Sequence, residues 1–71
     1  MFNKNQDPEW TRGISHLRSF ITLNGTADVP ITYVCRDNFK LGLWVSQQKR
    51  IGTRLPVEKV RQLREFGVPL Q

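Results

Sequence analysis

The chain contains one cysteine, Cys35, among 71 residues, so it cannot form an internal disulfide. Small domains without such cross-links depend on the packing of one hydrophobic core. A chain of this length makes a single domain and buries about 60–65% of the surface of its unfolded state. A lone thiol fits a reducing compartment, and we therefore expect a cytoplasmic protein. The sequence has no apolar run typical of a signal peptide or a membrane-spanning helix, so we expect neither.

An apolar stripe near the N-terminus predicts a first helix over residues 8–24. Asp7 can cap its start, and Pro8 suits the first helical position. Gly25 tolerates the left-handed conformation that commonly ends a helix. Gly13, inside the stripe, is unfavourable by about 1 kcal/mol relative to alanine. The stripe itself consists of Trp10, Ile14, Leu17, Phe20 and Ile21.

Residues 25–40 have no helical periodicity and predict a long connection. Pro30 biases Val29 toward an extended conformation. The alternation in residues 31–35 is typical of a short extended segment. No partner strand is visible, so we expect Val29 and Tyr33 to pack over the helices and tether the connection without forming a sheet.

A second helix is predicted between a cap at Asp37 or Asn38 and a stop at Gly52. Gly42 lies one turn into it, where glycine is unfavourable, so we expect another element to approach closely there. Gln48 places an amide on the apolar side, where it needs hydrogen-bond partners. The structural interpretation is a bond to the backbone of the connection, and the functional one is a contact with a base edge.

A third helix is predicted to begin with Pro56 in its first position and to end at Gly67. Its apolar residues repeat every third position, which indicates a crossing rather than a parallel alignment. The fold class is therefore all-α: a compact three-helix bundle with a long tethered connection between the first and second helices. We expect a flexible N-terminal segment over residues 1–7 and one domain over residues 8–70. The predicted core contains Trp10, Leu17, Phe20, Tyr33, Leu41, Trp44, Val45, Gln48 and Leu63.

Charge is distributed unevenly along the sequence. The net charge of the chain is +5, and in residues 1–35 three basic residues are balanced by three acidic ones. Residues 36–54 contain five basic residues against Asp37 alone, a net charge of +4. Such a concentration favours an anionic partner such as nucleic acid, although basic residues scattered over a solvated surface would give the same total.

An ordered set of motifs resembles the bacterial helicase-associated domain. The set begins with Trp10, continues with Gly25 and Val29-Pro30, and reaches Leu-Gly-Leu-Trp-Val-Ser-Gln-Gln-Lys over residues 41–49. It closes with the helix that ends at Gly67, and the resemblance covers about residues 10–70. Three positions depart from the usual pattern, with Lys49 in place of arginine, Pro56 in place of serine or threonine, and Leu70 in place of tryptophan.

The resemblance implies a three-helix module, usually repeated in tandem and attached to a helicase-like ATPase. It also implies nucleic-acid binding as the role of the module. A fold does not determine a function, so the function depends on the residues of the site.

No arrangement of residues in the sequence supports catalysis. There is no Ser-His-Asp or Cys-His set, no carboxylate pair and no glycine-rich phosphate loop. Cys35 and His16 are too few for a structural zinc site, which takes about four ligands. We expect His16 to be exposed. The sequence therefore predicts a protein that is not an enzyme and has no metal and no cofactor.

The basic residues are the best candidates for a functional site. We expect the second helix and its flanks to face phosphates, and we interpret Glu58, Arg61 and Glu65 of the third helix as solvated ion pairs. The candidate nucleic-acid-binding residues are Arg36, Lys40, Lys49, Arg50, Arg54, Lys59 and Arg64.

The predicted function is an accessory nucleic-acid-binding module of a larger helicase-like protein. We expect largely non-specific contacts with the backbone, DNA rather than RNA as the partner, and a monomer when the domain is isolated. The alternative is a protein-interaction module that docks onto the ATPase core or another partner. Leu43 discriminates between the two, because an exposed apolar patch around it would favour protein docking and isolation among basic residues would favour nucleic acid.

Overall fold

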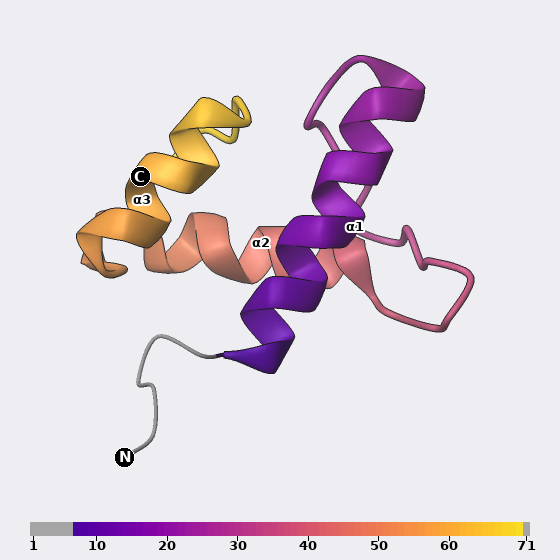
Figure 1. Ribbon diagram of the computed structural model, residues 1–71, viewed down its shortest axis with the longest axis horizontal. Helices are drawn as coiled ribbons and strands as arrows, with labels where there is room; N and C mark the ends of the chain where they lie inside the picture. The colour runs from indigo at the N-terminus through magenta and orange to yellow at the C-terminus, as the bar shows by residue number, and fades with distance from the viewer. Residues whose placement is uncertain (1–6, 71) are drawn as a thin grey trace.

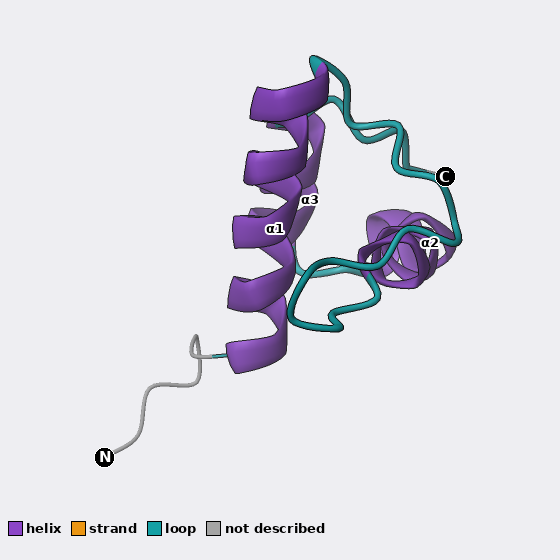
Figure 2. Ribbon diagram, turned by 90° about the vertical axis from the view of Figure 1, so that its right-hand side faces the viewer, coloured by secondary structure: helices purple, strands orange, loops and turns teal. Residues whose placement is uncertain are grey.

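A computed structural model describes residues 7–70 of the chain. The order of elements is α1 (Pro8–Asn24), α2 (Leu41–Ile51), a short 3-10 helix η1 (Gly52–Arg54) and α3 (Val57–Glu65). Figure 1 shows α1 and α3 side by side, with α2 running across both. In the turned view of Figure 2, α1 and α3 overlap in one layer, and α2 lies in a second layer with much of the loop structure. The predicted all-α three-helix bundle is confirmed.

The first helix has the predicted bounds, and its ends have the predicted causes. Asp7 is the N-cap, and its carboxylate accepts a hydrogen bond of 3.2 Å from the backbone N–H of Trp10. Gly25 ends the helix in the left-handed conformation, with φ 74°. Asp7 also belongs to the predicted flexible segment 1–7, but the structure holds it at the helix start, and residues 1–6 lie outside the described part of the chain.

The second helix begins later than predicted. Its N-cap is Lys40, which makes no side-chain capping bond, so the prediction of a cap at Asp37 or Asn38 is wrong. The Asp37 carboxylate instead accepts the backbone N–H of Phe39 at 3.2 Å, which closes a tight turn. Asn38 occupies the left-handed region within this turn, with φ 69°, a conformation that asparagine tolerates. Asp37 therefore stabilises a turn and does not cap the helix.

The third helix follows the short element η1, which the sequence did not predict. Pro56 precedes α3 as its N-cap and is not its first residue. The helix ends before Gly67, whose φ of 89° is accessible mainly to glycine. The N–H of Val68 then donates to the carbonyl of Leu63 at 3.0 Å, and this bond turns the tail back toward the core. Val68 is 2% exposed, so the tail adds to the packing.

The connection between α1 and α2 is held against α2 at Gly42. The N–H of Gly42 donates to the carbonyl of Tyr33 at 3.1 Å. A Cβ atom at position 42 would collide with the carbonyl oxygens of Pro30 and Ile31. The expected close approach of another element to Gly42 is therefore confirmed.

The core lies where α2 crosses the layer formed by α1 and α3. Its largest fully buried side chains come from all three helices: Leu17, Leu41, Leu63 and Val45. Of the other predicted core residues, Phe20, Trp44 and Gln48 are buried, whereas Trp10 and Tyr33 are half-buried. The structure describes no strand between residues 7 and 70, in agreement with the expectation that the connection forms no sheet.

Candidate nucleic-acid interface

The segment from the end of the connection to η1 carries basic side chains that have no acidic partner. None of them forms an ion pair with a carboxylate among residues 7–70. The one acidic residue of the segment, Asp37, is bound by Arg12 of α1 instead, with Nη2 and Oδ2 3.0 Å apart. The basic set therefore keeps its charge available to a ligand. It consists of Arg36, Lys40, Lys49, Arg50 and Arg54.

The fold divides this set between the two ends of α2. Arg36 and Lys40 precede the helix, whereas Lys49 and Arg50 lie in its last turn. Ten residues of α-helix separate Lys40 from Arg50, a rise of about 15 Å. Arg54 ends η1, where its Nε donates to the carbonyl of Ile51 at 3.4 Å. Cations in the last turn also complement the partial negative charge of the helix end, so part of their role is structural.

Lys59 has structural partners that the sequence analysis did not foresee. Its Nζ lies 3.1 Å from Asp7 Oδ2 and 4.7 Å from the centre of the Trp10 ring. The hydrogen bond from Lys59 lowers the pKa of the Asp7 carboxyl. Both contacts join α3 to the start of α1, so the charge of Lys59 is already partly neutralised.

The outer side of α3 presents two further arginines. Arg61 and Arg64 form no ion pair within the described residues, so the predicted pairing of Arg61 with Glu58 and Glu65 is not formed. Both arginines line a shallow groove of about 360 Å³, together with Val57 and Val60. Arg64 was a predicted site residue, whereas Arg61 was not.

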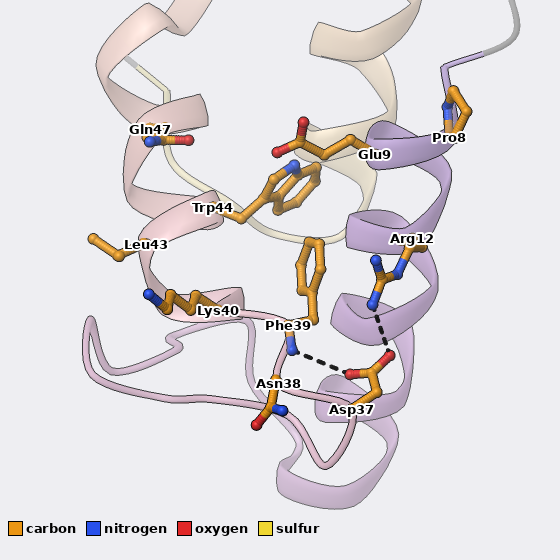
Figure 3. Close-up of a pocket in the computed structure, with 10 residues that line it drawn as sticks. All are labelled: Pro8, Glu9, Arg12, Asp37, Asn38, Phe39, Lys40, Leu43, Trp44 and Gln47. Carbon is orange, nitrogen blue, oxygen red and sulfur yellow. Dashed lines mark hydrogen bonds and ion pairs between the residues drawn. The ribbon is translucent and has the colours of Figure 1, made fainter.

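A larger groove of about 570 Å³ lies between α2 and the first turns of α1. Figure 3 shows the rings of Phe39 and Trp44 between the two helices, with Lys40 and Leu43 on the α2 side. Leu43 is 45% exposed, and Lys40 and Gln47 line the same groove. Phe39 belongs neither to a helical stripe nor to a motif, so the sequence does not predict its place in this groove.

A compact cluster forms where the turn before α2 meets α1. Asp37 contacts both Arg12 and His16, and the Nε2 atom of His16 lies 3.1 Å from Asp37 Oδ2. The Arg12 guanidinium lowers the pKa of the Asp37 carboxyl. The His16 ring stacks on Phe39 with centroids 5.0 Å apart, and its side chain is only 26% exposed. The expectation that His16 is simply exposed is therefore wrong.

The tryptophans and Gln48 are placed for packing. Trp44 is 4% exposed and lies 5.2 Å from Trp10 between ring centroids, so its faces are not free to stack on bases. The indole N–H of Trp10 donates to Gln62 Oε1 at 3.2 Å. Gln48 is buried, but none of the side-chain hydrogen bonds among residues 7–70 joins its amide to the connection, contrary to the structural interpretation. The ring of Tyr33 meets Phe20 edge to face at 5.0 Å.

The environment of the only thiol does not favour nucleophilic chemistry. Burial raises the pKa of the Cys35 thiol, and the nearby Asp37 charge acts in the same direction. Reactive cysteines require the opposite shift, because the thiolate is the nucleophile. The structure thus provides no activated nucleophile at Cys35.

Comparison with known proteins identifies the family. No helix within residues 7–70 is long and apolar enough to cross a membrane. The chain matches no curated protein and no solved structure. A protein-family model described as "Helicase associated domain" matches residues 7–70, which is nearly the whole chain. This small helical domain is an accessory module of helicase-like proteins, and the chain belongs to the helicase-associated domain family.

Proposed function

We propose that the domain binds nucleic acid, with DNA as the preferred partner, through the two basic ends of α2. The contacts are mainly with the phosphate backbone and carry little sequence preference. The domain is a non-enzymatic accessory module that increases the affinity of a helicase-like protein for nucleic acid. The free Cys35 thiol supports the cytoplasm as its location.

The observation that carries this proposal is the unpaired charge of segment 36–54. Its five basic residues have no carboxylate partner within the described chain. Asp37, which could have neutralised one of them, is held by Arg12. Unpaired lysines and arginines release condensed counterions when they neutralise phosphates, and this release drives non-specific binding.

The proposal predicts a weak interaction that depends strongly on salt. Five phosphate contacts give a slope of about −4 to −5 for the logarithm of the binding constant against the logarithm of salt concentration on duplex DNA. An isolated domain is expected to bind with a Kd of roughly 10⁻⁴–10⁻⁶ M, as other non-specific binders do. Tandem copies or a linked ATPase would strengthen binding through avidity.

A fluorescence-anisotropy titration with labelled DNA at several salt concentrations tests the proposal. The variant Arg50→Gln/Arg54→Gln is expected to bind about tenfold more weakly at low salt and to reduce the salt slope by about 2. The matched control is Arg18→Gln/Arg61→Gln, which removes the same charge from α1 and α3. Equal losses in the two variants would show that only the total charge matters and would overturn the assignment to α2. The same titration with single strands and with RNA determines the preferred partner.

Protein docking is the second candidate, and exposed apolar residues favour it. Val57 is 70% exposed beside the groove of Arg61 and Arg64, and Leu43 is 45% exposed. Leu43 shares its groove with Phe39 and Trp44 as well as with Lys40, so it is not isolated among basic residues, and its surroundings favour neither candidate. Leu43→Gln should leave DNA binding nearly unchanged under our proposal. A protein-docking module would instead lose its affinity for the helicase core in this variant.

A further inference from the structure

Side chains with three kinds of metal-binding atom meet at the edge of the α1–α2 groove. His16 comes from α1, whereas Cys35 and Asp37 come from the connection that precedes α2. One candidate ligand atom from each residue lies within 4.8 Å of the other two. From the sequence, Cys35 and His16 alone were too few for a zinc site and no metal was predicted, whereas the tertiary structure brings Asp37 beside them.

We propose that His16, Cys35 and Asp37 form a binding site for a zinc ion, with one coordination position open to solvent. The three ligands are not among the residues of the proposed nucleic-acid interface, although Arg36 of that interface lies between Cys35 and Asp37 in the sequence.

The chemistry of the three donors selects zinc over the common alkaline-earth ions. Imidazole nitrogen, thiolate sulfur and carboxylate oxygen are the protein ligands of Zn²⁺, whereas Ca²⁺ and Mg²⁺ prefer oxygen alone. Zinc binding would displace the proton of the Cys35 thiol into solvent, and the resulting thiolate and the ionised Asp37 would together balance the charge of the divalent ion. Zinc-to-ligand distances of about 2.0–2.3 Å place tetrahedral ligand atoms roughly 3.5 Å apart. The observed cluster therefore needs side-chain movements of only about 1 Å to close around the ion.

The backbone already holds the two loop ligands close together. The N–H of Cys35 donates to the carbonyl of Phe39 at 2.8 Å, and the N–H of Asn38 donates to the carbonyl of Cys35 at 2.9 Å. The Oδ1 atom of Asp37 accepts the N–H of Phe39, whereas Oδ2 contacts Arg12 and His16 and would have to exchange these contacts for a metal ion. These bonds close the turn without a metal, so an ion would not have to order the loop.

The remaining ligand, His16, is oriented by its neighbours. Its ring stacks on Phe39 with 25° between the ring planes, and Nε2 faces Asp37 Oδ2 at 3.1 Å. The preferred orientation of a ligand before binding reduces the entropy lost when the metal is bound.

Arg12 competes with a metal for the same oxygen. Its Nη2 lies 3.0 Å from Asp37 Oδ2, and a divalent ion at the cluster would repel the guanidinium. The Arg12 side chain is 55% exposed, so it can move into solvent. Zinc binding must therefore break this ion pair, and removal of the Arg12 charge should strengthen zinc binding.

Titration of the 71-residue chain with Co²⁺ under reducing conditions tests the site. Binding is expected to give the visible absorption of tetrahedral cobalt and a thiolate-to-cobalt charge-transfer band, saturating at one equivalent and disappearing when Zn²⁺ is added. Cys35→Ser should abolish the charge-transfer band, and His16→Gln should weaken binding more than about tenfold. Circular dichroism of each variant verifies that the helices remain.

Two further variants separate a built site from adventitious binding. Arg12→Gln should bind Co²⁺ and Zn²⁺ several-fold more tightly than the original chain, because Asp37 loses its competing partner. Asp28→Asn, which alters another exposed carboxylate of the connection, should leave the metal affinity unchanged. The proposal is overturned if the folded chain gives no cobalt spectrum, if Cys35→Ser retains the charge-transfer band, or if Arg12→Gln binds no more tightly.

Discussion

The two contacts that α1 makes with the other helices differ in kind. Against α2, α1 presents Gly13, and the absence of a side chain there admits the indole of Trp44. Against α3, α1 makes long-range contacts through side-chain ends: Trp10 with Gln62, and Asp7 with Lys59. A groove of about 680 Å³ lies along this second contact. The α1–α2 contact therefore depends on exact shape at Gly13, whereas the α1–α3 contact adds polar groups that water can replace to the core packing around Leu63.

The largest expected effect on stability is at the contact between α2 and the connection, which also depends on the absence of a side chain. Gly42→Ala should destabilise the domain by about 3 kcal/mol, because the new Cβ would overlap backbone carbonyls that cannot rotate away. The free energy of unfolding, measured by urea denaturation, tests this prediction. The control is Ser46→Ala in the same helix, which should change stability by less than about 0.5 kcal/mol. An unchanged free energy of unfolding in Gly42→Ala would show that the connection can shift and that the contact does not depend on shape.

Gly13→Ala tests the contact between α1 and α2 themselves. Helix propensity alone predicts stabilisation by about 1 kcal/mol, because alanine is the better helix former. The structure predicts the opposite sign, a loss of about 2 kcal/mol, because the Cβ would overlap the Trp44 ring. The free energy of unfolding of Gly13→Ala, measured by urea denaturation, distinguishes these two predictions directly. A decrease in the near-ultraviolet dichroism of the tryptophans would locate the damage at this contact, whereas a stabilised variant would contradict it.

These two glycines show how far the sequence alone could predict the fold. The ends of α1 were predictable because Asp7 and Gly25 act on their own helix ends. The close approach at Gly42 was predictable because glycine is otherwise unfavourable there. Gly13 is equally unfavourable in its helix, but its partner, Trp44, could not be predicted, since the two residues are distant in sequence and only the tertiary structure brings them together.

The candidate site was harder to predict for the same reason. The charge excess of residues 36–54 is a local property and was visible in the sequence. The partners of single charges are not local: Lys59 pairs with a residue 52 positions away, and Asp37 with one 25 positions away. For this reason Lys59 was predicted among the nucleic-acid-binding residues, and Asp37 or Asn38 was predicted to cap a helix.

The contact between α1 and α3 should tolerate substitution better. Gln62→Ala removes the acceptor of the Trp10 indole N–H, and we expect a loss of about 1 kcal/mol, since the groove lets water replace the amide. The matched control is Arg61→Ala, an exposed neighbour on the same helix that makes no side-chain hydrogen bond in the described structure. Thermal unfolding measures both. A loss as large as that of Gly42→Ala would show that this contact, too, depends on shape.

The smallest expected effect concerns two carboxylates: Asp7 at the contact between α1 and α3, and Asp37 where the connection meets α1. Hydrogen bonds from Lys59 and Arg12 lower the pKa values of Asp7 and Asp37, respectively, below the ordinary carboxyl value. The folded state therefore favours the ionised forms, and their contribution to stability is complete above about pH 4 and is lost as the pH falls through the lowered pKa values. Unfolding measured between neutral pH and pH 2 should show this decline.

Asp7→Asn and Asp37→Asn should each be slightly less stable at neutral pH and should each show a shallower decline in acid. Asp28→Asn, which changes a carboxylate outside both contacts, should keep the original pH dependence. An unchanged acid decline in Asp7→Asn would mean that the Lys59 pair contributes nothing, and that α3 is held to α1 by packing and the Trp10–Gln62 bond alone.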